Sequence, residues 1–518
     1  MKPELQKIFT VDPFKEMNPD KPGEVCNLLE GKWVQGKVFR KDLPDPLNGG
    51  VFLRVPDTNE YSKYIDNLDI CPKSGLHNPL KNVERYLLLG DVCTNAAELL
   101  RDKEVSAYFA KLIQRVMPKS ASQCLGEVRV TRIFLENFSG DNVRFLARGF
   151  SNPGDHLGQE SSGYRWPFGS VCIIAPFNFP LEIPVLQVMG ALFMGNRPLV
   201  KVDSRVSVVF EQFLRLLIHC GLPSEDLDFI NCKGEVMGDL LKQSNGKIRL
   251  TQFTGSKQVA NKLSVDLKGK IKIEDAGFDW KVIGPDYDPE WSKYVANQCD
   301  EDAYNASGQK CSAQSILFVH RSWEKDLLPR LADLASKREL RNLDIGPVLT
   351  WTNSQLNEHI NSLLKIKGSK LLFGGQELTN HSIPSNYGSL RPTAIEIPIE
   401  ELLSDKFGLV TKEVFGPFQV VVLYTDKQIN LVKKSLEKIT QNLTAAIVSN
   451  DVLFQQDILG STVNGTTYTG MKARTTGAPQ NHWFGPSGDP RSAGIGTREA
   501  IVSTWSSHRE IIKDVGPY

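Results

Sequence analysis

Hydrophobic and polar positions follow two alternating periods over residues 171–275. Short apolar runs typical of buried strands alternate with segments whose apolar residues recur every three or four positions, as in amphipathic helices. The expected strands are Val171–Pro176, Pro198–Val202, Leu227–Asn231, Ile248–Phe253 and Lys270–Asp275. The expected helices are Leu181–Met194, Val206–Cys220, Glu235–Gln243 and Ser256–Leu267. This alternation predicts an α/β fold with a doubly wound parallel sheet, which binds ligands at the carboxyl ends of its strands.

The flanking regions show weaker patterns. Two β-rich stretches, 30–40 and 49–57, come before helical patterns that extend over residues 84–146. A polar, glycine-rich stretch at 149–169 predicts a projecting hairpin. A second α/β region follows Asp275 and extends to about residue 450. Its expected helix is Pro289–Asn305, and its expected strands are Ser315–His320 and Phe418–Tyr424.

Charge and cysteine content narrow the class of partner. The 518 residues include 61 Lys plus Arg and 60 Asp plus Glu, and no basic run provides a footprint for nucleic acid. The expected partner is therefore a small molecule. The nine cysteines have no regular spacing and no C-x-x-C, so we expect neither a disulfide framework nor a metal site, and a reducing compartment fits best.

The most apolar stretch, Val171–Gly195, is long enough to suggest a membrane span. Five residues interrupt it, which argues against a span: Pro176, Asn178, Pro180, Glu182 and Pro184. The first residues, "MKPELQKIFTVDPFKEM", lack the apolar core of a signal peptide and contain acids that an Arg-rich transit peptide lacks. We therefore expect no membrane span, and we expect that any transit peptide is absent from this chain.

Phosphate binding is one candidate chemistry. "LTQFTGSKQVANKL" predicts a strand, a Thr-Gly-Ser turn and a helix, whose first N–H groups and Ser256 hydroxyl could hold a pyrophosphate. Ser256 is equally a good helix N-cap with no ligand, and the chain has neither G-x-G-x-x-G nor a Walker sequence. Both interpretations stay open at this point.

Two polar positions follow expected strands. Asn178, in "APFNFP", could donate its side-chain NH₂ to a developing oxyanion, or it could simply form a turn. Glu274 and Asp275 end the fifth strand, where a carboxylate is well placed to act as a general base. The alternative for these paired acids is ordinary solvation.

Cys311 lies in "NASGQKCSAQS", between an expected helix and an expected strand. A thiol with a pKa of about 8.5 is only a few per cent thiolate at neutral pH, so a catalytic cysteine needs a proton acceptor or positive surroundings. No Cys/His/Asn protease arrangement accompanies it. Nucleophile and inert buried cysteine both remain possible from these neighbours alone.

Taken together, these segments resemble a known family. In chain order "APFNFP", "KVDS", "FTGS", "KIEDAG", "GQKC" and "KEVFGPF" resemble the signature segments of the aldehyde dehydrogenase superfamily, from about residue 25 to the C-terminus. "FGPSGDPRSAGIGTRE" resembles its substrate-anchoring loop and closing motif, with a few extra residues. The resemblance implies four parts: an NAD-binding domain (1–148 and 169–274), a catalytic domain (275–460), oligomerisation elements (149–168 and 498–518) and a substrate-anchoring segment (461–497).

The resemblance also implies a mechanism. Cys311 would attack the aldehyde carbon, and the Asn178 side chain and the Cys311 backbone N–H would hold the oxyanion. Hydride transfer from the thiohemiacetal to nicotinamide would leave a thioester, which Glu274 would hydrolyse by activating water. The implied cofactor-binding residues are Ile174, Pro176, Phe177, Lys201, Ser204, Gly255, Ser256, Val259, Asp275, Glu413 and Phe415. Lys201 and Glu413 match positions that hold the riboses.

Two departures from the family pattern bear on these roles. The family often has K-P-x-E where this chain has "KVDS", so Ser204 replaces the acid that reads the adenine ribose and Asp203 lies beside it. NAD is the expected cofactor. NADP is the alternative, because the acid that would repel its 2′-phosphate is missing. "EDAGFDW" replaces the usual E-L-G-G-K-x-P but keeps Glu274 and Gly277.

Within the superfamily, the segments "PFNF" and "GQKCSA" are similar to those of the 1-pyrroline-5-carboxylate dehydrogenases. The sequence as a whole is similar to their plant-type branch. These enzymes oxidise L-glutamate γ-semialdehyde to glutamate. The similarity implies that Phe179 lines the aliphatic chain, that Ser312 donates to the α-carboxylate, and that amides of Gly485–Ser492 complete that site. The alternatives are a dehydrogenase for another semialdehyde, a non-redox cysteine hydrolase, and a catalytically silent relative.

The family resemblance extends to location and assembly. It implies the mitochondrial matrix, with the cytoplasm as the alternative. It also implies a homo-oligomer, a dimer or larger, that assembles through the hairpin Gly149–Gly169 and a C-terminal strand near Ile501–Ile512.

Overall fold

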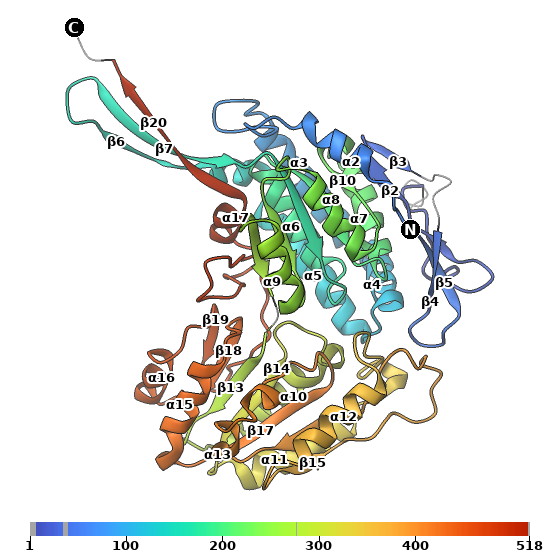
Figure 1. Ribbon diagram of the computed structural model, residues 1–518, viewed down its shortest axis with the longest axis vertical. Coiled ribbons are helices and arrows are strands. Elements are labelled where there is room, and N and C mark those ends of the chain that lie inside the picture. Colours follow the sequence, from blue (N-terminus) through green and yellow to red (C-terminus); the bar gives the residue numbers. More distant parts are fainter. Residues whose placement is uncertain (1–6, 35–39, 276, 516–518) are drawn as a thin grey trace.

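Two seven-stranded sheets and a projecting three-stranded arm dominate the computed structural model, which describes residues 7–34, 40–275 and 277–515 (Figure 1). A smaller sheet near the N-terminus contains β1 (Gly23–Glu24), β4 (Arg40–Pro44) and β5 (Val51–Pro56). The stretch 49–57 is therefore a strand, as expected. Residues 35–39 of the other β-rich stretch lie outside the described residues.

The first large sheet has the strand order β12-β11-β8-β9-β10-β2-β3. Its five parallel strands are β8 (Ser170–Ala175), β9 (Arg197–Val202), β10 (Asp228–Phe229), β11 (Thr251–Thr254) and β12 (Ile271–Glu274). Because β8 lies between β9 and β11, the winding reverses there, and a crevice opens at the carboxyl ends of those strands. The doubly wound fold is confirmed. An antiparallel pair, β2 (Asn27–Leu29) and β3 (Lys32–Val34), extends the sheet beyond the prediction.

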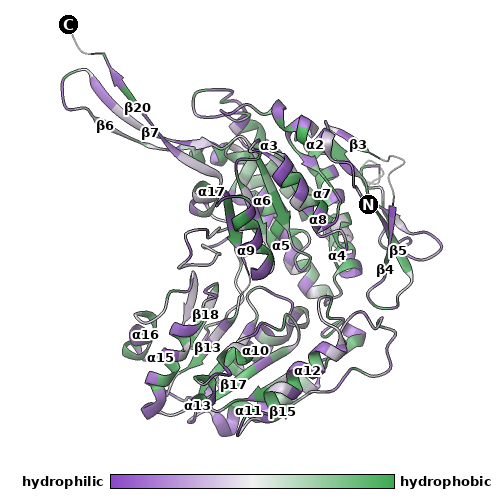
Figure 2. Cartoon of the chain, in the orientation of Figure 1, coloured by the Kyte–Doolittle hydropathy of each residue, from purple (hydrophilic) through white to green (hydrophobic). Residues whose placement is uncertain are grey.

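The helices between these strands begin and end within one residue of the expected bounds. They are α6 (Glu182–Phe193), α7 (Ser207–His219), α8 (Gly234–Gln243) and α9 (Lys257–Asp266). Every residue of α6 is buried, because the helix lies between the sheet and other helices (Figure 2). The apolar run 171–195 is thus β8 followed by a core helix. None of the described helices is long and apolar enough to cross a membrane.

Further helices precede the five parallel strands of the first sheet in the chain. They are α2 (Ser62–Asn67), α3 (Arg85–Arg101), α4 (Lys103–Val116) and α5 (Ala121–Asn137). Helix α5 packs against α6, so the segment before the sheet reaches the turn that follows β8.

The second large sheet has the order β15-β16-β17-β14-β13-β18-β19, and β15 alone is antiparallel to its neighbour. The strands are β13 (Asp279–Ile283), β14 (Gln314–His320), β15 (Lys370–Phe373), β16 (Thr393–Glu396), β17 (Phe418–Tyr424), β18 (Thr444–Val448) and β19 (Thr466–Thr469). The helices are α10 (Pro289–Tyr304), α11 (Glu324–Ser336), α12 (Asn353–Leu364), α13 (Ile399–Leu402), α14 (Phe407–Val410), α15 (Ile429–Lys438) and α16 (Val452–Leu459). Strand β19 belongs to this sheet although it follows the expected boundary at residue 460. The division into domains stays a prediction.

The arm consists of β6 (Phe150–Pro153), β7 (Gln159–Pro167) and β20 (Ser506–Asp514), and Figure 1 shows it extending away from both lobes. The hairpin at 149–169 lies where it was expected. The expected strand Ile501–Ile512 was wrong in its first five residues, which belong to α17 (Arg498–Trp505). Thr497 caps this helix by accepting from the Ala500 amide, and its buried residues recur at helical spacing.

Candidate active site

Two cavities meet at Cys311. One, of about 450 Å³, opens at the carboxyl ends of β8, β9 and β11. The other, of about 330 Å³, lies between α5, α6, α10 and the segment after β19. Cys311, Glu274 and Ile183 line both cavities. A reaction at the Cys311 sulfur could therefore draw one reactant from each side.

The larger cavity collects most of the expected cofactor-binding residues. Eight of them line it: Ile174, Pro176, Phe177, Lys201, Gly255, Ser256, Glu413 and Phe415. Ser204 lines an adjoining cavity of about 260 Å³, together with Lys201. Val259 and Asp275 are not among the residues that line either space.

The turn at Gly255–Ser256 leads from β11 into α9. Ser256 is the N-cap residue, but its side chain makes no capping hydrogen bond, so the hydroxyl does not satisfy the first-turn amides. Such amides suit the phosphates of a dinucleotide. The turn, Lys201 and the Glu413 carboxylate line one cavity, so the donors and acceptors present fit a nicotinamide dinucleotide.

Asp203 and Arg205, which line this cavity, form an ion pair. The Arg205 guanidinium donates to both carboxylate oxygens at 3.0 and 2.7 Å, and it lies 4.7 Å from the centre of the Phe177 ring. Burial opposes ionisation of Asp203, but the Arg205 charge prevails and lowers the pKa of Asp203 to about 2. Asp203 is therefore an anion whose charge Arg205 already balances.

The loop before Cys311 has an unusual backbone. Ala306, Ser307 and Gly308 are consecutive left-handed residues, with φ of 55°, 56° and 68°. A non-glycine residue in this region costs about 1–2 kcal/mol. A Cβ on Gly308 would lie 2.0 Å from the Gly416 carbonyl oxygen, so that position requires glycine. Strain of this kind persists where the surrounding structure enforces it, and here it sets the position of Cys311.

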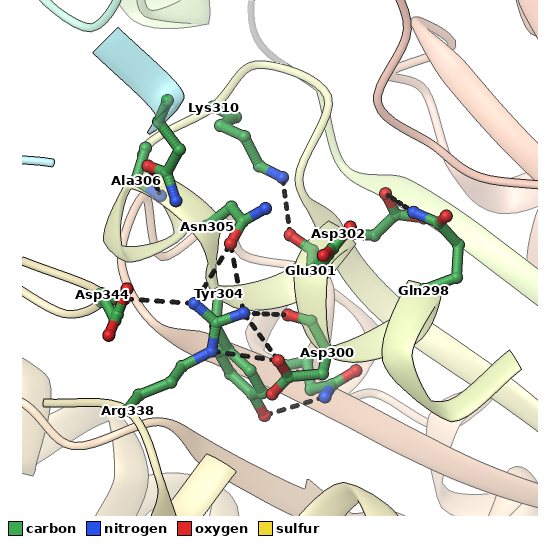
Figure 3. Close-up of polar contacts among 12 residues, drawn as sticks. Gln298, Asp300, Glu301, Asp302, Tyr304, Asn305, Ala306, Lys310, Arg338 and Asp344 are labelled. Atoms are coloured by element: carbon green, nitrogen blue, oxygen red, sulfur yellow. Dashed lines mark hydrogen bonds and ion pairs between the residues drawn. The ribbon is translucent and has the colours of Figure 1, made fainter. Parts of the chain in front are cut away.

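Hydrogen bonds from other elements hold this loop. The Ala306 amide donates to Gln123 of α5 at 3.0 Å, and the Gly346 amide donates to the Ser307 hydroxyl at 2.7 Å. The Asn305 side chain accepts from Arg338 at 3.1 Å (Figure 3). The conformation before the nucleophile thus depends on three distant segments.

Gly277 allows the segment after β12 to approach the nucleophile. A Cβ at this position would lie 2.1 Å from the Cys311 carbonyl oxygen. The sequence "EDAGFDW" departs from the family pattern but keeps glycine at this contact. Its Ala276 lies outside the described residues.

Glu274 and Cys311 influence each other's ionisation. Glu274 is 2% exposed, and its carboxylate oxygens have no partner of normal hydrogen-bond geometry. Burial raises the pKa of Glu274 to about 7, and interaction with the Cys311 thiol offsets part of that rise. Burial and the nearby Glu274 carboxylate raise the pKa of Cys311 well above its ordinary value. The resting thiol is therefore protonated beside a carboxylate able to take its proton near neutral pH.

The backbone of Asn178 is held by a buried ion pair. Lys119 donates to the Asn178 carbonyl oxygen at 3.2 Å and to Glu127 at 2.7 Å, and both charged side chains are almost fully buried. Glu127 also accepts from the amides of Leu181 and Glu182, which begin α6. No sequence pattern indicated this pair, because a Lys and a Glu near the start of a helix are usually solvated.

The smaller cavity contains both expected substrate residues, Phe179 and Ser312. The Lys119 ammonium lies 4.4 Å from the centre of the Phe179 ring. Other side chains come from elements far apart in the sequence: Glu182, Gln298, Glu301, Asp302, Lys310, Arg474, Thr476, Phe484 and Ile495.

The loop Gly485–Ser492 is not among the residues that line this cavity, contrary to expectation. It runs instead along the edge of β12, where the Ile273 amide donates to the Arg491 carbonyl oxygen at 2.8 Å. The Ala493 amide returns a bond to the Ile273 carbonyl oxygen at 2.9 Å. The polar backbone of an edge strand needs such hydrogen-bond partners. Residues of the segment 474–479 line the cavity where the Gly485–Ser492 loop was expected.

Lys310, next to the nucleophile, was missed as a functional residue. Its ammonium donates to the Glu301 carbonyl oxygen and to the Thr476 hydroxyl, both at 2.9 Å, and Figure 3 shows the first contact. Burial lowers the pKa of Lys310 to about 8. Lys310 thereby connects α10 to the segment that follows β19. Its place beside Cys311 in "GQKC" was the available signal.

The described residues contain no cluster of His, Cys, Asp and Glu suited to a metal ion. All nine cysteines are free, and Cys311 alone among them is partly exposed.

Comparison with known proteins identifies the family. Residues 90–500 match the model of the aldehyde dehydrogenase family. The chain is 59% identical over 513 residues to the mitochondrial delta-1-pyrroline-5-carboxylate dehydrogenase 12A1 of Arabidopsis thaliana, across 98% of this chain and 91% of that protein. It superimposes on methylmalonate-semialdehyde dehydrogenase of Oceanimonas doudoroffii with a TM-score of 0.81, at 19% identity over 96% of this chain and 99% of that one. A betaine aldehyde dehydrogenase of Staphylococcus aureus in complex with NAD⁺ gives 0.79, at 19% identity over 95% of each chain.

Proposed function

The chain belongs to the aldehyde dehydrogenase family, whose members use NAD or NADP, and on that premise we propose that it oxidises L-glutamate γ-semialdehyde to L-glutamate with NAD, in proline catabolism. The semialdehyde is in equilibrium with 1-pyrroline-5-carboxylate. The observation that carries the proposal is the near full-length identity to a delta-1-pyrroline-5-carboxylate dehydrogenase. The cavity beside Cys311 supports it, since this space contains charges of both signs, as an amino-acid aldehyde does.

The first step is attack by Cys311 on the aldehyde carbon. Glu274 is the neighbouring carboxylate, and its pKa of about 7 suits it to take the thiol proton at neutral pH. The Asn178 side chain and the Cys311 amide donate to the oxyanion of the thiohemiacetal. Lys119 keeps Asn178 in place through its backbone.

The second stage releases the acid. NAD would be held by the Gly255–Ser256 turn, Lys201 and Glu413, and it supplies the hydride acceptor. Glu274 then takes a proton from the water that hydrolyses the Cys311 thioester. One carboxylate thus serves both stages, which requires that it loses its proton between them.

The substrate chain lies in the smaller cavity. Phe179 contacts the methylene groups, and Ser312 donates to the α-carboxylate. Lys310 also lines this cavity and adds a buried positive charge near Ser312, which favours binding of the carboxylate there. The carboxylate end therefore faces the α10 side of the cavity.

NAD is the proposed cofactor and NADP the alternative. Ser204 provides no acid to repel a 2′-phosphate, and the Asp203 charge is already balanced by Arg205. The NAD⁺ complex of the staphylococcal betaine aldehyde dehydrogenase supports NAD, and the ratio of the two activities tests this choice directly.

The mitochondrial matrix is the proposed location, because the Arabidopsis relative is described as mitochondrial, and the cytoplasm is the alternative. We further infer a homo-oligomer that assembles through the arm. Strands β6 and β20 are its free edges, and apolar side chains on it are exposed, Leu157 by 85% and Ile512 by 62%. Exposed edges and apolar side chains of this kind require a partner.

A dehydrogenase for another semialdehyde is the nearest rival, and a hydrolase without redox chemistry is the more distant one. The hydrolase would leave the larger cavity and its phosphate-binding turn without a purpose. Reduced-cofactor formation should be measured with L-glutamate γ-semialdehyde, succinate semialdehyde and a plain aliphatic aldehyde, each with NAD and with NADP. The proposal expects a clear preference for the first aldehyde with NAD. Equal or faster rates with the others would exclude the substrate but keep the family.

A further inference from the structure

Glu182 is a buried carboxyl group that none of the proposed steps uses. It is the first residue of α6, it is 8% exposed, and it lines the smaller cavity. No described residue gives its side chain a hydrogen bond or an ion pair. In the sequence it stood out only as an acid that interrupts an apolar run.

The neighbouring acid, Glu127, differs in this respect. Glu127 accepts a bond from Lys119 and two more from backbone amides of α6. Lys119 is committed to Glu127, to the Asn178 carbonyl and to the face of Phe179. Neither residue is available to balance Glu182.

A buried carboxylate without a partner is unfavourable, since the cavity wall cannot replace its hydration. Burial, with smaller contributions from the Glu127 and Glu274 charges, raises the pKa of Glu182 to about 8, although Lys119 opposes the rise. The Glu182 charge also acts on the Cys311 thiol, which places it near the reacting group. A bound cation would provide the missing partner.

The residues that α10, the loop after it and the segment after β19 contribute to the cavity include positive groups. Lys310 is buried there, and Arg474 lies exposed at the edge of the cavity. Two acids of α10 also line the cavity, but Asp302 is paired with Lys281 and Glu301 is exposed to solvent. The unbalanced buried charge on the α10 side is therefore that of Lys310, while α6 offers the unpaired Glu182. That separation of charge complements an amino-acid zwitterion attached to a short aldehyde chain.

We propose that Glu182 accepts the α-ammonium group of the aldehyde and so sets the preference for an amino-acid aldehyde over its analogue without the amino group. This role rests on the proposed function, because it takes L-glutamate γ-semialdehyde as the substrate. Ionised Glu182 pairs with the ammonium, while Ser312 and Lys310 hold the carboxylate.

The test compares L-glutamate γ-semialdehyde with glutarate semialdehyde, which has the same chain and carboxylate but no ammonium. Glu182→Gln should lower kcat/KM for the first aldehyde by about 10- to 100-fold, mainly through KM, since a charged hydrogen bond is lost. Activity with glutarate semialdehyde should stay the same or rise. Glu182→Asp should recover part of the preference, and Glu98→Gln, an exposed acid on α3, is the matched control.

Two outcomes would overturn the role of Glu182. An equal loss with both aldehydes would make Glu182 a proton relay to Glu274 or a support for the turn. An unchanged preference would mean that the ammonium binds elsewhere. A wild-type enzyme that prefers neither aldehyde would instead contradict the proposed function itself.

A measurement on the wild-type enzyme avoids any folding defect of the variants. Competitive inhibition by L-glutamate should strengthen as pH rises through about 8, because binding requires ionised Glu182. Inhibition by glutarate should weaken over the same range, since it has only negative groups. Lys119, Glu127 and Glu274 act on Glu182 whichever ligand is bound. Lys310, whose pKa is also about 8, loses its charge over the same range and weakens carboxylate binding of both ligands. The readout is therefore the ratio of the two inhibition constants, which should shift in favour of L-glutamate as pH rises, and parallel pH profiles would contradict the assignment.

Discussion

The two cavities that meet at Cys311 are built in different ways. The larger one is lined mainly by residues at the carboxyl ends of adjacent strands of a single sheet, so each strand and its following turn contribute a run of neighbouring residues to the wall. The smaller one is assembled from α5, α6, α10 and the segment after β19, and its lining residues are spread from Lys119 to Ile495. Local sequence patterns therefore pointed to most of the first cavity and to little of the second.

The difference also concerns charge. In the larger cavity the Asp203 and Arg205 charges balance each other. In the smaller one Glu182 is unpaired, and Lys310 is held only by neutral oxygen atoms. Unbalanced charges are the groups that a substrate can satisfy, so this comparison assigns recognition of the aldehyde to the smaller cavity.

Cys311→Ala gives the largest expected effect and tests whether the two cavities function together. Turnover should be abolished because Cys311 supplies the thiol that lines both cavities, while NAD binding should persist because the larger cavity is intact. Reduced-cofactor formation and quenching of protein fluorescence by NAD measure the two properties. Undiminished dehydrogenase activity would contradict the mechanism.

Lys119→Met breaks the buried ion pair that supports the smaller cavity. We expect a loss of about 3–5 kcal/mol in the free energy of unfolding, because Glu127 would keep an unpaired buried charge. Lys337→Met is the matched control, since Lys337 pairs with Asp333 at the surface and should change stability by less than about 1 kcal/mol. Urea unfolding measures both variants. Similar values for the two would mean that the buried pair does not support the turn.

Asn178→Ala removes a proposed oxyanion donor at the junction. We expect kcat to fall by about 10²- to 10³-fold, or about 3–4 kcal/mol, with little change in NAD affinity. Steady-state kinetics and a binding titration separate the two effects. If only NAD affinity falls, Asn178 belongs to the cofactor cavity alone.

Glu274→Gln removes the base of both stages, but unequally, because water is a far weaker acid than the Cys311 thiol and depends more on a base. Acyl-enzyme hydrolysis should slow more than hydride transfer, so stopped-flow traces should show a burst of reduced cofactor followed by a slow steady state. In the wild type, steady-state activity should rise with pH through about 7 as the Glu274 carboxyl loses its proton, and the variant should lack that rise. A variant without a burst that keeps the wild-type pH profile would exclude Glu274 as the base.

Ser204→Glu gives the smallest expected effect and concerns only the larger cavity. The new carboxylate would repel a 2′-phosphate, so the ratio of NADP to NAD activity should fall by about tenfold, which corresponds to about 1.4 kcal/mol. Preference among the aldehydes should not change. A change in aldehyde preference would show that the two cavities are coupled.

How far the sequence could predict the site depended on the distance between its parts. The turn after β11 and the acid at the end of β12 were visible because strand, turn and helix are contiguous. The ion pair of Lys119 with Glu127 was not visible, because its importance comes from α5 packing against α6. The Gly485–Ser492 loop was misplaced for the same reason: its position depends on the unpaired edge of β12.

By itself the sequence determined the alternating strands and helices, the doubly wound sheet, and the residues that follow each strand. Those features depend on the periodicity of apolar positions and on local turn chemistry, which neighbouring residues specify. Only the tertiary structure decided which charges lose their water and which of them gain partners. Burial and pairing are properties of contacts between distant segments, and they distinguish Glu127, a structural carboxylate, from Glu182, a carboxyl group left free to bind a ligand.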